Sequence, residues 1–446
     1  MFYHPNKFIN LNKNFNLGVY MFWQKEIETM EVSKLRKFQL DCINKQIRIA
    51  KKSEFYKNKL KNINEIKSLE EVSSLPFTTK QDLRDGFPYG FLCESKDNIV
   101  RIQSSSGTTG NPTIVFHTKQ DIDNWANIVA RGMYMVGVRH TDVFQVTDAY
   151  GLFTGGLGFH YGGEKIGLMI IPVGPGNSKR QVLFMKNFKT TVVTILPSYA
   201  LRLYNTIKEM GIDIKKDLNL KIFSLGAEPH SEAVRNKIEE LYGVKAYNSY
   251  GLSEVSGPGI AYECPYQAGP HIWEDYVYPE IIDPKTLELL PDGEEGELVL
   301  TTLQRQAMPL IRYRTRDLTR IISEPCKCGR THRRIARITA RTDDMIIING
   351  VNIFPIQIEK VIMALPESGS NYVIEIIEQN YMKKLQIKLE LKKDKFNAPL
   401  QDLENLKAKL TKNLKEELLV TPIVQFVEEG SLPTNEGKAK RVKFIN

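Results

Sequence analysis

The middle of the chain alternates short apolar runs with amphipathic helical segments, and this alternation constrains the fold more than any other feature of the sequence. Thr191–Leu196 reads as a buried strand, and Pro197 begins a helix directly after it. The pattern repeats with a strand over Leu220–Leu225, a turn over Gly226–Pro229 and a helix over Ser231–Tyr242. Successive units of this kind build a sheet of parallel strands with flanking helices. The sequence therefore predicts an α/β fold whose ligands bind at the carboxyl ends of the strands.

The length of 446 residues indicates more than one domain, because a single hydrophobic core stops growing well below that size. Near the C-terminus, strand signals over Tyr372–Ile377 and Leu385–Leu391 and a charged amphipathic helix over Leu400–Leu419 form a compact α+β pattern. We therefore expect a large N-terminal α/β domain over residues 1–342 and a small, mobile α+β domain over residues 343–446.

Composition and charge exclude several classes of protein. The chain is 42% hydrophobic and 25% charged, as in ordinary globular proteins, and no run of eighteen apolar residues indicates a membrane span. Residues 1–21 form an extension rich in Asn and Lys that lacks the apolar run of a signal peptide, so we expect a cytoplasmic protein without a membrane partner. The net charge of +9 suits anionic ligands. Because the lysines are scattered over the sequence, nucleic acid is not an expected partner.

A run of small residues, SSSGTTGNPT from Ser104 to Thr113, directly follows an apolar strand over Ile99–Ile102. Glycines let the backbone approach a phosphate closely, and hydroxyls and amides donate hydrogen bonds to its oxygens. The run lacks the lysine of a Walker loop, so a catalytic cation has to come from elsewhere. A flexible linker is the alternative, but the ordered sequence argues against it. The expected phosphate-binding residues are Ser104, Ser105, Ser106, Gly107, Thr108, Thr109 and Gly110.

That loop resembles the phosphate loop of the adenylate-forming enzymes, the superfamily of acyl-CoA synthetases, luciferases and adenylation domains. Four further motifs are similar to signatures of this superfamily in the same order: YGLSE from Tyr250, YRTRD from Tyr313, RTDD from Arg341, and Gly437-Lys438. The stretches LPFTTK from Leu75, YGLFTGG from Tyr150 and GVNIFP from Gly350 resemble one branch, the phenylacetate-CoA ligases. The resemblance runs from about Trp23 to Asn446.

The resemblance implies an ATP-dependent, AMP-forming carboxylate-CoA ligase that activates phenylacetate or another arylacetate, such as indoleacetate, as an acyl-adenylate. It also implies that the small domain rotates about Asp343 between the two half-reactions. ATP, Mg²⁺ and coenzyme A are the implied ligands. The catalytic residues implied are Lys438 as the cation of adenylate formation, with Lys440 left open as its substitute, Glu254 as the Mg²⁺ ligand, and Asp343 as the hinge.

The nucleotide site implied by the resemblance combines an aromatic wall, a loop and a carboxylate. Tyr250 would cover one face of adenine, and Asp317 would accept hydrogen bonds from the ribose hydroxyls. The motif around Asp317 has Arg316 where the superfamily commonly has glycine, although the phenylacetate branch typically shares this arginine. The remaining nucleotide-binding residues are Gly226, Ala227, Glu228, Pro229, Gly251 and Arg341, and the expected acid pocket is lined by Tyr150, Phe153 and Gly226.

A second group of residues has the chemistry of a zinc site. Cys326 and Cys328 are separated by one residue, and Cys264 and His271 precede them by about sixty, so the four together supply a tetrahedral ligand set. Buried reduced thiols are the alternative, and a CxC pair alone leaves it open. His332 is the reserve ligand if His271 faces the substrate pocket instead.

Other functions share the ATP motifs. A nucleotidyltransferase that adenylylates the hydroxyl of a deazaflavin-type cofactor, a stand-alone enzyme that loads a carrier protein, and a binding protein without activity are the alternatives. Lys438, Glu254 and Asp317 together argue against the last of these. For oligomeric state, a homodimer is the default expectation.

Overall fold

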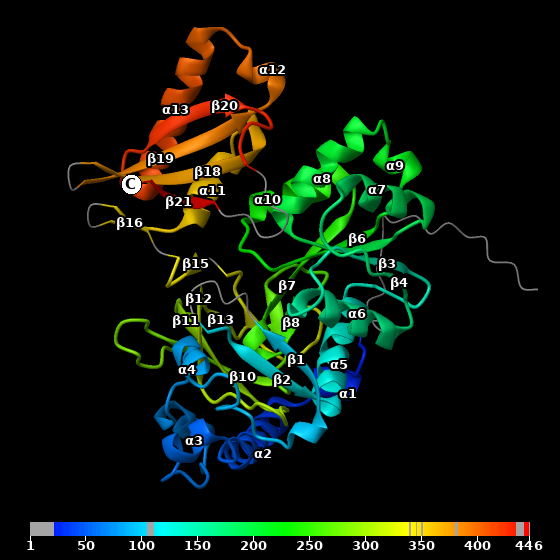
Figure 1. Ribbon diagram of the computed structural model, residues 1–446, viewed down its shortest axis with the longest axis vertical. Coiled ribbons are helices and arrows are strands. Elements are labelled where there is room, and N and C mark those ends of the chain that lie inside the picture. Colours follow the sequence, from blue (N-terminus) through cyan, green and yellow to red (C-terminus); the bar gives the residue numbers. More distant parts are fainter. Residues whose placement is uncertain are drawn as a thin grey trace, which may run out of the picture.

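The computed structural model of the chain describes residues 22–104, 111–338, 340–344, 346–348, 351–379, 382–433 and 441–445. Two parts are evident in Figure 1: a large part built on several sheets, and a smaller part at the C-terminal end of the chain. None of the helices in the described ranges combines the length and hydrophobicity that a membrane crossing requires.

The main sheet of the large part has nine strands in the order β13-β14-β9-β8-β7-β6-β5-β3-β4. The strands from β7 to β4 are parallel, as the repeated strand and helix signals predict. From β7 onward to β13 the strands are antiparallel, so the sheet is mixed rather than parallel throughout. The parallel strands are β3 (Val143–Val146), β4 (Met169–Ile171), β5 (Val192–Ile195), β6 (Ile222–Leu225) and β7 (Lys245–Leu252). The antiparallel ones are β8 (Gly257–Glu263), β9 (Pro270–Ile272), β13 (Ile321–Ile322) and β14 (Arg334–Ile335).

Helices cover both faces of this sheet. Because neighbouring side chains of a strand point to opposite faces, the apolar residues of one strand enter two different cores. Val192 belongs to the core under α5 and α6, whereas Val193 belongs to the core under α7, α8 and α10. The covering helices are α5 (Lys119–Met135), α6 (Thr154–Ile166), α7 (Ser178–Asn187), α8 (Pro197–Glu209) and α10 (Glu232–Tyr242). The expected helices after the two predicted strands are thereby confirmed as α8 and α10.

A second, four-stranded antiparallel sheet of the large part holds two of the sequence motifs side by side. Its order is β10-β11-β12-β15, and Asp317 of β12 lies directly opposite Arg341 of β15. The strands are β10 (Val277–Ile282), β11 (Gly296–Thr302), β12 (Tyr313–Thr319) and β15 (Ala340–Arg341). The pairing of β12 with β15 brings the YRTRD and RTDD motifs next to each other.

The strand before the Ser/Gly run is confirmed as β1 (Ile99–Ser104), but it does not join the main sheet. It pairs only with β2 (Ile114–Thr118), as an antiparallel ribbon whose two strands flank residues 105–113. The expected N-terminal helix is α2 (Val32–Ala50). The remaining helical elements of the large part are α1 (Lys25–Glu28), α3 (Glu54–Lys59), η1 (Leu69–Ser74), α4 (Lys80–Asp85), η2 (Lys96–Asn98), α9 (Ile214–Asp217) and η3 (Ser253–Val255).

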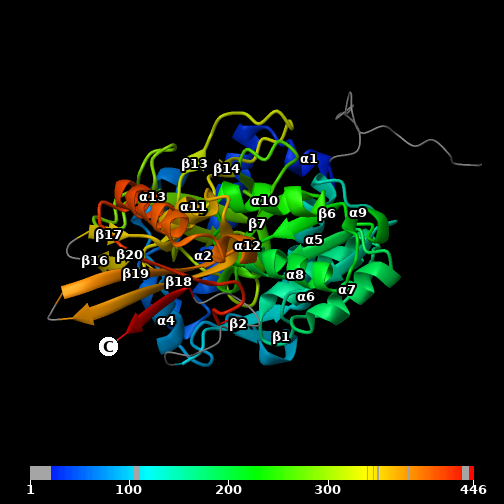
Figure 2. The same cartoon turned by 90° about the horizontal axis from the view of Figure 1, so that it is seen from above.

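The C-terminal part is an α+β module, as predicted. Its sheet has the order β20-β19-β18-β21, and a core that includes Ile374, Ile387 and Leu414 fills the space between this sheet and two helices. Figure 2 shows these helices, α11 and α13, over the strands. The elements are β16 (Ile346–Ile348), β17 (Val351–Ile353), α11 (Pro355–Met363), β18 (Ser368–Gln379), β19 (Met382–Leu391), α12 (Lys393–Phe396), α13 (Leu400–Leu418), β20 (Ile423–Glu428) and β21 (Val442–Ile445). The module contacts the large part where α8 meets β18 and α10 meets α11.

A buried ion pair ties helix α5 to the antiparallel half of the large part. Arg131 is 1% exposed, and its Nη1 and Nη2 donate to the two carboxylate oxygens of Asp275 at 2.7 and 3.0 Å. The guanidinium also lies over the ring of Trp273. A bidentate pair of this kind leaves an uncompensated buried charge when one partner is removed.

We expect Arg131→Met to lower the free energy of unfolding by about 3–5 kcal/mol, because Asp275 is then left buried without its counter-ion. Adding Asp275→Asn to this variant should recover part of the loss. Urea denaturation followed by circular dichroism measures both effects. Lys119→Ala is the control, since the exposed pair of Lys119 with Asp123 contributes less than about 1 kcal/mol. Equal losses in Arg131→Met and Lys119→Ala would contradict the prediction.

Candidate nucleotide site

A cavity of roughly 130 Å³ lies at the carboxyl ends of β6 and β7, where the parallel half of the main sheet meets the second sheet. Its lining brings together residues from four separate motifs: residues 226–229, Tyr250, Gly251, Asp317 and Arg341. All of these are nucleotide-site residues expected from the sequence. The carboxyl edge of parallel strands is where α/β folds bind ligands.

Asp317 is the carboxylate of this cavity, and two side chains hold it. The hydroxyl of Tyr250 donates to Oδ2 at 2.7 Å, and Nη1 of Arg341 donates to Oδ1 at 2.8 Å. Burial raises the pKa of Asp317, although the charge of Arg341 opposes the rise. Burial, together with the charge of Asp317, also raises the pKa of Tyr250 well above its ordinary value. Tyr250 therefore stays a neutral donor, and Asp317 is an acceptor fixed in place on the cavity wall.

The guanidinium of Arg341 donates hydrogen bonds to two carboxylates. Besides Asp317, its Nε and Nη2 donate to the two oxygens of Asp343 at 2.9 and 3.0 Å. Burial disfavours the charged guanidinium, but the hydrogen bonds and charges of Asp343 and Asp317 raise its pKa overall. The same guanidinium lowers the pKa of Asp343 against the effect of burial. One cation thus joins the cavity wall to the residue expected to be the hinge.

Two glycines permit the close approaches that form the cavity. A Cβ on Gly226 would lie 2.8 Å from the carbonyl oxygen of Ser249, and a Cβ on Gly251 would lie 2.0 Å from that of Gly257. Only glycine fits at such distances. Gly251 allows the tight reversal from β7 into β8 that places Tyr250 and Glu254 on one hairpin.

Glu228 lies in the cavity loop, but its carboxylate turns toward helix α8. Its Oε1 accepts a hydrogen bond from the backbone N–H of Ser198 at 2.6 Å, so it caps the N-terminus of that helix. Next to it, burial and the charge of Arg337 lower the pKa of His230 to about 3. Neutral His230 accepts a hydrogen bond from Nη1 of Arg337 at 2.7 Å, directly after the loop of residues 226–229.

A second cavity of roughly 760 Å³ adjoins the first and is rich in cationic side chains, with Lys80, Arg84, Lys285, Arg316 and Arg341 in its lining. Glu254 lies there, 7% exposed, with its Oε1 3.3 Å from Nζ of Lys80. Lys80 starts helix α4, which Thr79 and Asp82 cap reciprocally. The motif LPFTTK contains Lys80, but no role for this lysine could be predicted, because nothing local in the sequence relates it to Glu254. A cavity with this charge suits a polyphosphate.

Arg316 occupies the position at which the commoner superfamily motif has glycine, and its backbone explains that glycine. The φ of Arg316 is 69°, in the left-handed region that glycine adopts most readily. The guanidinium of Arg316 lies 3.5 Å from the buried carboxylate of Glu297.

Several predicted residues lie outside the described residues: Ser105, Ser106, Gly107, Thr108, Thr109, Gly110, Gly350, Gly437, Lys438 and Lys440. Ser104, the last residue of β1, is described, and its N–H donates to the carbonyl of Leu152 at 2.9 Å. Ser104, the first residue of the expected phosphate loop, is therefore next to the N-terminal end of α6.

The three residues expected to line the acid pocket come from three places in the chain: the turn after β6, the segment after β3 and the residue before α6. Gly226 lines the cavity under Tyr250. Tyr150 is half-buried, and its hydroxyl lies 3.2 Å from Nδ1 of His160. Phe153, the N-cap residue of α6, is 47% exposed. Phe153 lies next to β1, since its carbonyl oxygen accepts from Nε2 of Gln103 at 2.9 Å.

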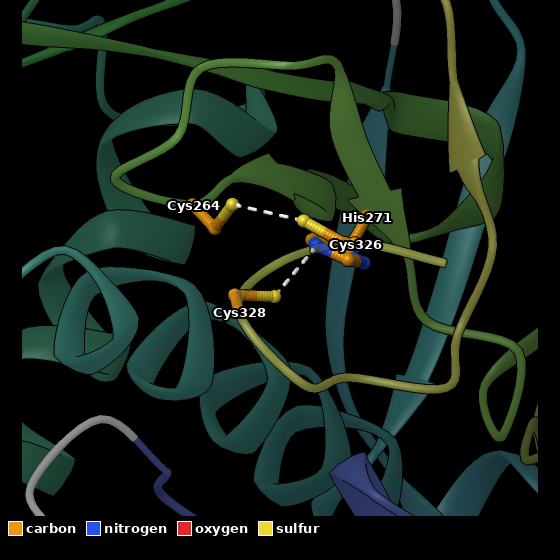
Figure 3. Close-up of side chains that lie close together, drawn as sticks. All are labelled: Cys264, His271, Cys326 and Cys328. Carbon is orange, nitrogen blue, oxygen red and sulfur yellow. Dashed lines mark hydrogen bonds between the residues drawn. The ribbon is translucent and has the colours of Figure 1, made fainter. Parts of the chain in front are cut away.

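The four potential metal ligands of the sequence come together about the loop between β13 and β14, in the antiparallel half of the main sheet (Figure 3). Their ligand atoms all lie within 4.8 Å of one another. Sγ of Cys264 is 3.7 Å from Sγ of Cys326, and Sγ of Cys328 is 3.2 Å from Nε2 of His271. None of the four belongs to a disulfide.

A backbone carbonyl orients the imidazole of His271. Nδ1 of His271 lies 2.8 Å from the carbonyl oxygen of His332, which leaves Nε2 directed at the thiols. The ring of His332 itself is engaged elsewhere, with the N–H of Glu274 and the carbonyl of Ile27. His332 is therefore not the reserve ligand, and His271 does not face the acid pocket.

Comparison with known proteins agrees with the motifs. The family model "AMP-binding enzyme" matches residues 30–305, and "AMP-binding enzyme C-terminal domain" matches residues 350–443. The phenylacetate-coenzyme A ligase of Aromatoleum evansii is 41% identical over 93% of this chain and 96% of its own length. The phenylacetate-coenzyme A ligase of Escherichia coli (strain K12) is 42% identical over 85% of this chain and 86% of its own length.

Among solved structures, 2-hydroxyisobutyryl-CoA ligase is similar in fold at 27% identity. In its postadenylation state, with R3-HIB-AMP, it superposes with a TM-score of 0.89 over 99% of this chain and 95% of that one. In its thioesterification state, with 2-HIB-AMP and CoA, the TM-score is 0.71 over 98% of this chain and 96% of that one, at 28% identity. The arrangement of the two parts in this chain therefore matches the postadenylation state of that protein.

Proposed function

Since the chain belongs to the AMP-binding enzymes, in the family of the phenylacetate-coenzyme A ligases, we propose that the acid it activates is phenylacetate or a related arylacetate. The protein is an ATP-dependent, AMP-forming ligase that joins a carboxylic acid to coenzyme A. Nucleotidyl transfer to a cofactor hydroxyl and loading of a carrier protein are not favoured, because the relatives at about 40% identity are coenzyme A ligases along nearly their whole length. The cavity around Tyr250, Asp317 and Arg341 is the observation that carries the nucleotide chemistry.

In the nucleotide site, the chain's own residues recognise the adenosine. The ring of Tyr250 and the loop of residues 226–229 would form the two walls around adenine. The two carboxylate oxygens of Asp317 accept hydrogen bonds. The ribose hydroxyls would donate to them in place of the Tyr250 hydroxyl. Tyr250 and Arg341 hold the carboxylate in position before the nucleotide arrives, so binding requires little ordering.

Glu254 fits the magnesium ion that the family uses. Its carboxylate is buried, presents a hard oxygen ligand, and lies in the cation-rich cavity that suits the phosphates. When bound, Mg²⁺ would neutralise phosphate charge. Lys80 compensates the charge of Glu254 in the structure and lines the same cation-rich cavity.

Adenylate formation brings together a carboxylate and a phosphate, both anionic, so a cation placed there only at that moment favours the transition state. We assign this cation to Lys438, in the small domain over residues 343–446. Rotation of this domain about Asp343 would then withdraw Lys438 and bring the surroundings of Gly350 to the thiol. The ion pair of Asp343 with Arg341 supports the hinge assignment, because it links the first residue of the small domain to the nucleotide cavity.

Release of pyrophosphate tests the proposed substrate and acceptor together. Arylacetates should release pyrophosphate from ATP, and coenzyme A should be consumed only when such an acid is present. A panel of aryl and aliphatic acids, assayed with and without coenzyme A, identifies the acid. Pyrophosphate release with aliphatic acids alone would overturn the arylacetate assignment, and turnover without consumption of coenzyme A would favour a different acceptor.

We expect Lys438→Ala to slow acyl-adenylate formation by about 10² to 10³, the usual cost of one preorganised charge at a transition state. Thioester formation from a presupplied acyl-adenylate should be nearly unchanged, because the charge is needed only in the first step. Rapid-quench assays of the two half-reactions measure both rates, and Lys440→Ala is the control. A larger loss in Lys440→Ala than in Lys438→Ala would move the role to the neighbouring lysine.

Asp343→Pro should have the opposite pattern, with adenylate formation retained and thioester formation slowed by about tenfold or more. Proline fixes φ, so it hinders the dihedral change that a hinge needs. Asp343→Ala is the matched control, because it removes the same ion pair with Arg341 and leaves the backbone free. Thioester synthesis in the proline variant at the rate of the alanine variant would remove the hinge from this position.

We further propose that Cys264, His271, Cys326 and Cys328 bind a structural zinc ion. Zinc bonds to thiolates at about 2.3 Å, and in a tetrahedron this separates two sulfurs by about 3.8 Å. The separation of 3.7 Å between Sγ of Cys264 and Sγ of Cys326 fits this value. Four protein ligands leave no open position, so the ion would clasp distant segments together and would neither activate water nor bind the acid.

Protein purified without chelator should contain about one zinc per chain by elemental analysis. Cys326→Ser combined with Cys328→Ser should lower the thermal midpoint, on the order of 5–10 °C, and leave the KM for ATP of the folded fraction unchanged. Cys42→Ser, which changes a half-buried thiol outside the cluster, is the control. Zinc-free protein with a normal thermal midpoint would defeat the proposal.

The location and assembly of the protein are also proposals. A cytoplasmic location fits an enzyme that consumes ATP and coenzyme A. A homodimer is the default for a protein of this kind, and sedimentation velocity distinguishes it from a monomer. We propose no nucleic-acid or membrane partner.

A further inference from the structure

A single carboxylate from the small part contacts the start of a helix in the large part. Glu359 is on helix α11, and its Oε1 accepts a hydrogen bond from the backbone N–H of Ser231 at 3.1 Å. Its other oxygen, Oε2, accepts from the buried hydroxyl of Tyr372 at 3.0 Å, within the small part. The first bond crosses the contact between α10 and α11, and the second holds the carboxylate in the orientation that makes the first.

The sequence of α10 explains why an acceptor is needed at this point. Ser231 is the N-cap residue, and its hydroxyl accepts from the N–H of Val234, the third residue of the helix. In a complete capping box, a Glu, Gln or Asp at that third position accepts from the N–H of the N-cap residue in return. Helices α4 and α5 have such an acceptor, Asp82 and Asp121. Valine has none, and Glu359 takes this place from the other side of the contact.

Some of the surrounding charges stabilise the hydrogen bond between Ser231 and Glu359, and others weaken it. The positive end of the α10 dipole favours a carboxylate at its N-terminus, and Arg441, which lies over the ring of Tyr372 at 4.2 Å, favours the ionised form of Glu359. Burial and the nearby carboxylate of Glu228 act in the opposite direction and raise the pKa of Glu359. Because these effects oppose one another, the hydrogen bond between Glu359 and Ser231 can form and break.

The contact belongs to one orientation of the small part. The arrangement in this chain matches the postadenylation state of a related ligase far better than its thioesterification state, with TM-scores of 0.89 and 0.71. Asp343 precedes α11 in the chain, so a rotation there moves Glu359 relative to Ser231. The bond to Ser231 is therefore lost when the orientation changes.

We propose that Glu359 is a positioning residue for the first half-reaction: it completes the capping box of α10 across the contact and so stabilises the orientation in which the adenylate is made. This inference rests on the proposed two-step function. Glu359 touches neither the nucleotide cavity nor the cation-rich cavity, so it acts through the placement of the small domain.

Three variants test this role. Glu359→Ala should slow adenylate formation by about tenfold, as expected for the loss of one hydrogen bond to a charged acceptor, and thioester formation from presupplied acyl-adenylate should be unchanged or faster. Glu359→Gln should recover most of the loss, because its amide oxygen still accepts from Ser231. Lys360→Ala, on the same helix but paired with Glu417 inside the small part, should match the unaltered protein.

Hydrogen exchange gives a readout that does not depend on activity. The amides at the start of α10 should exchange about tenfold faster in Glu359→Ala than in Lys360→Ala, with equal thermal midpoints for the two variants. Unchanged exchange there, or equal losses in both half-reactions of Glu359→Ala, would overturn the proposal. Failure of the unaltered protein to activate any acid would count against the proposed function alone, because the exchange experiment would still measure the contact.

Discussion

The pairing of Asp317 with Arg341 is the interaction on which the rest of the site depends. It joins β12 to β15, where the two residues lie opposite each other, and it fixes a hydrogen-bond acceptor in the wall of the cavity. A carboxylate buried to this degree is costly unless a cation and hydrogen bonds compensate its charge, and Arg341 and Tyr250 provide both. Because Arg341 also donates to Asp343, the charge of Asp317 and the position of the proposed hinge depend on the same guanidinium.

The two halves of the main sheet have different tasks in building this site. The parallel half ends in open turns, where Gly226 allows the loop of residues 226–229 to approach Ser249. The antiparallel half begins where the chain reverses over Ser253–Val255, and the hairpin of β7 and β8 carries Tyr250 and Glu254. In a wholly parallel sheet, a crossover helix would follow β7 in place of this hairpin.

What the sequence predicts well is what local chemistry determines. The strands expected at Thr191–Leu196 and Leu220–Leu225 are mostly apolar because both faces of the sheet are covered, and they are observed as the shorter β5 and β6. Ser231 begins its helix with a hydroxyl that accepts a hydrogen bond from the first turn. The four potential metal ligands are also recognisable, since two cysteines at short spacing with a further Cys and His are typical of a zinc ligand set. The pairing of β1 with β2 in a separate ribbon was not predictable, because periodicity identifies a strand but not its partner.

Contacts between distant segments are the least predictable part of the structure. The contacts within the large part are stronger than the hydrogen bond that joins it to the small part at α10. In the large part, Arg131 with Asp275 and Arg330 with Glu28 are fully buried ion pairs, whose disruption leaves a charge in a dry interior. The small part is held at α10 by a neutral N–H and a half-buried carboxylate. A bond of this kind contributes about 1.5–3 kcal/mol, enough to favour one orientation by a factor of ten or more and little enough to be replaced by contacts in another. The large part is thereby held together around the cavity by strong contacts, whereas the proposed rotation of the small part would have to break only a weaker one.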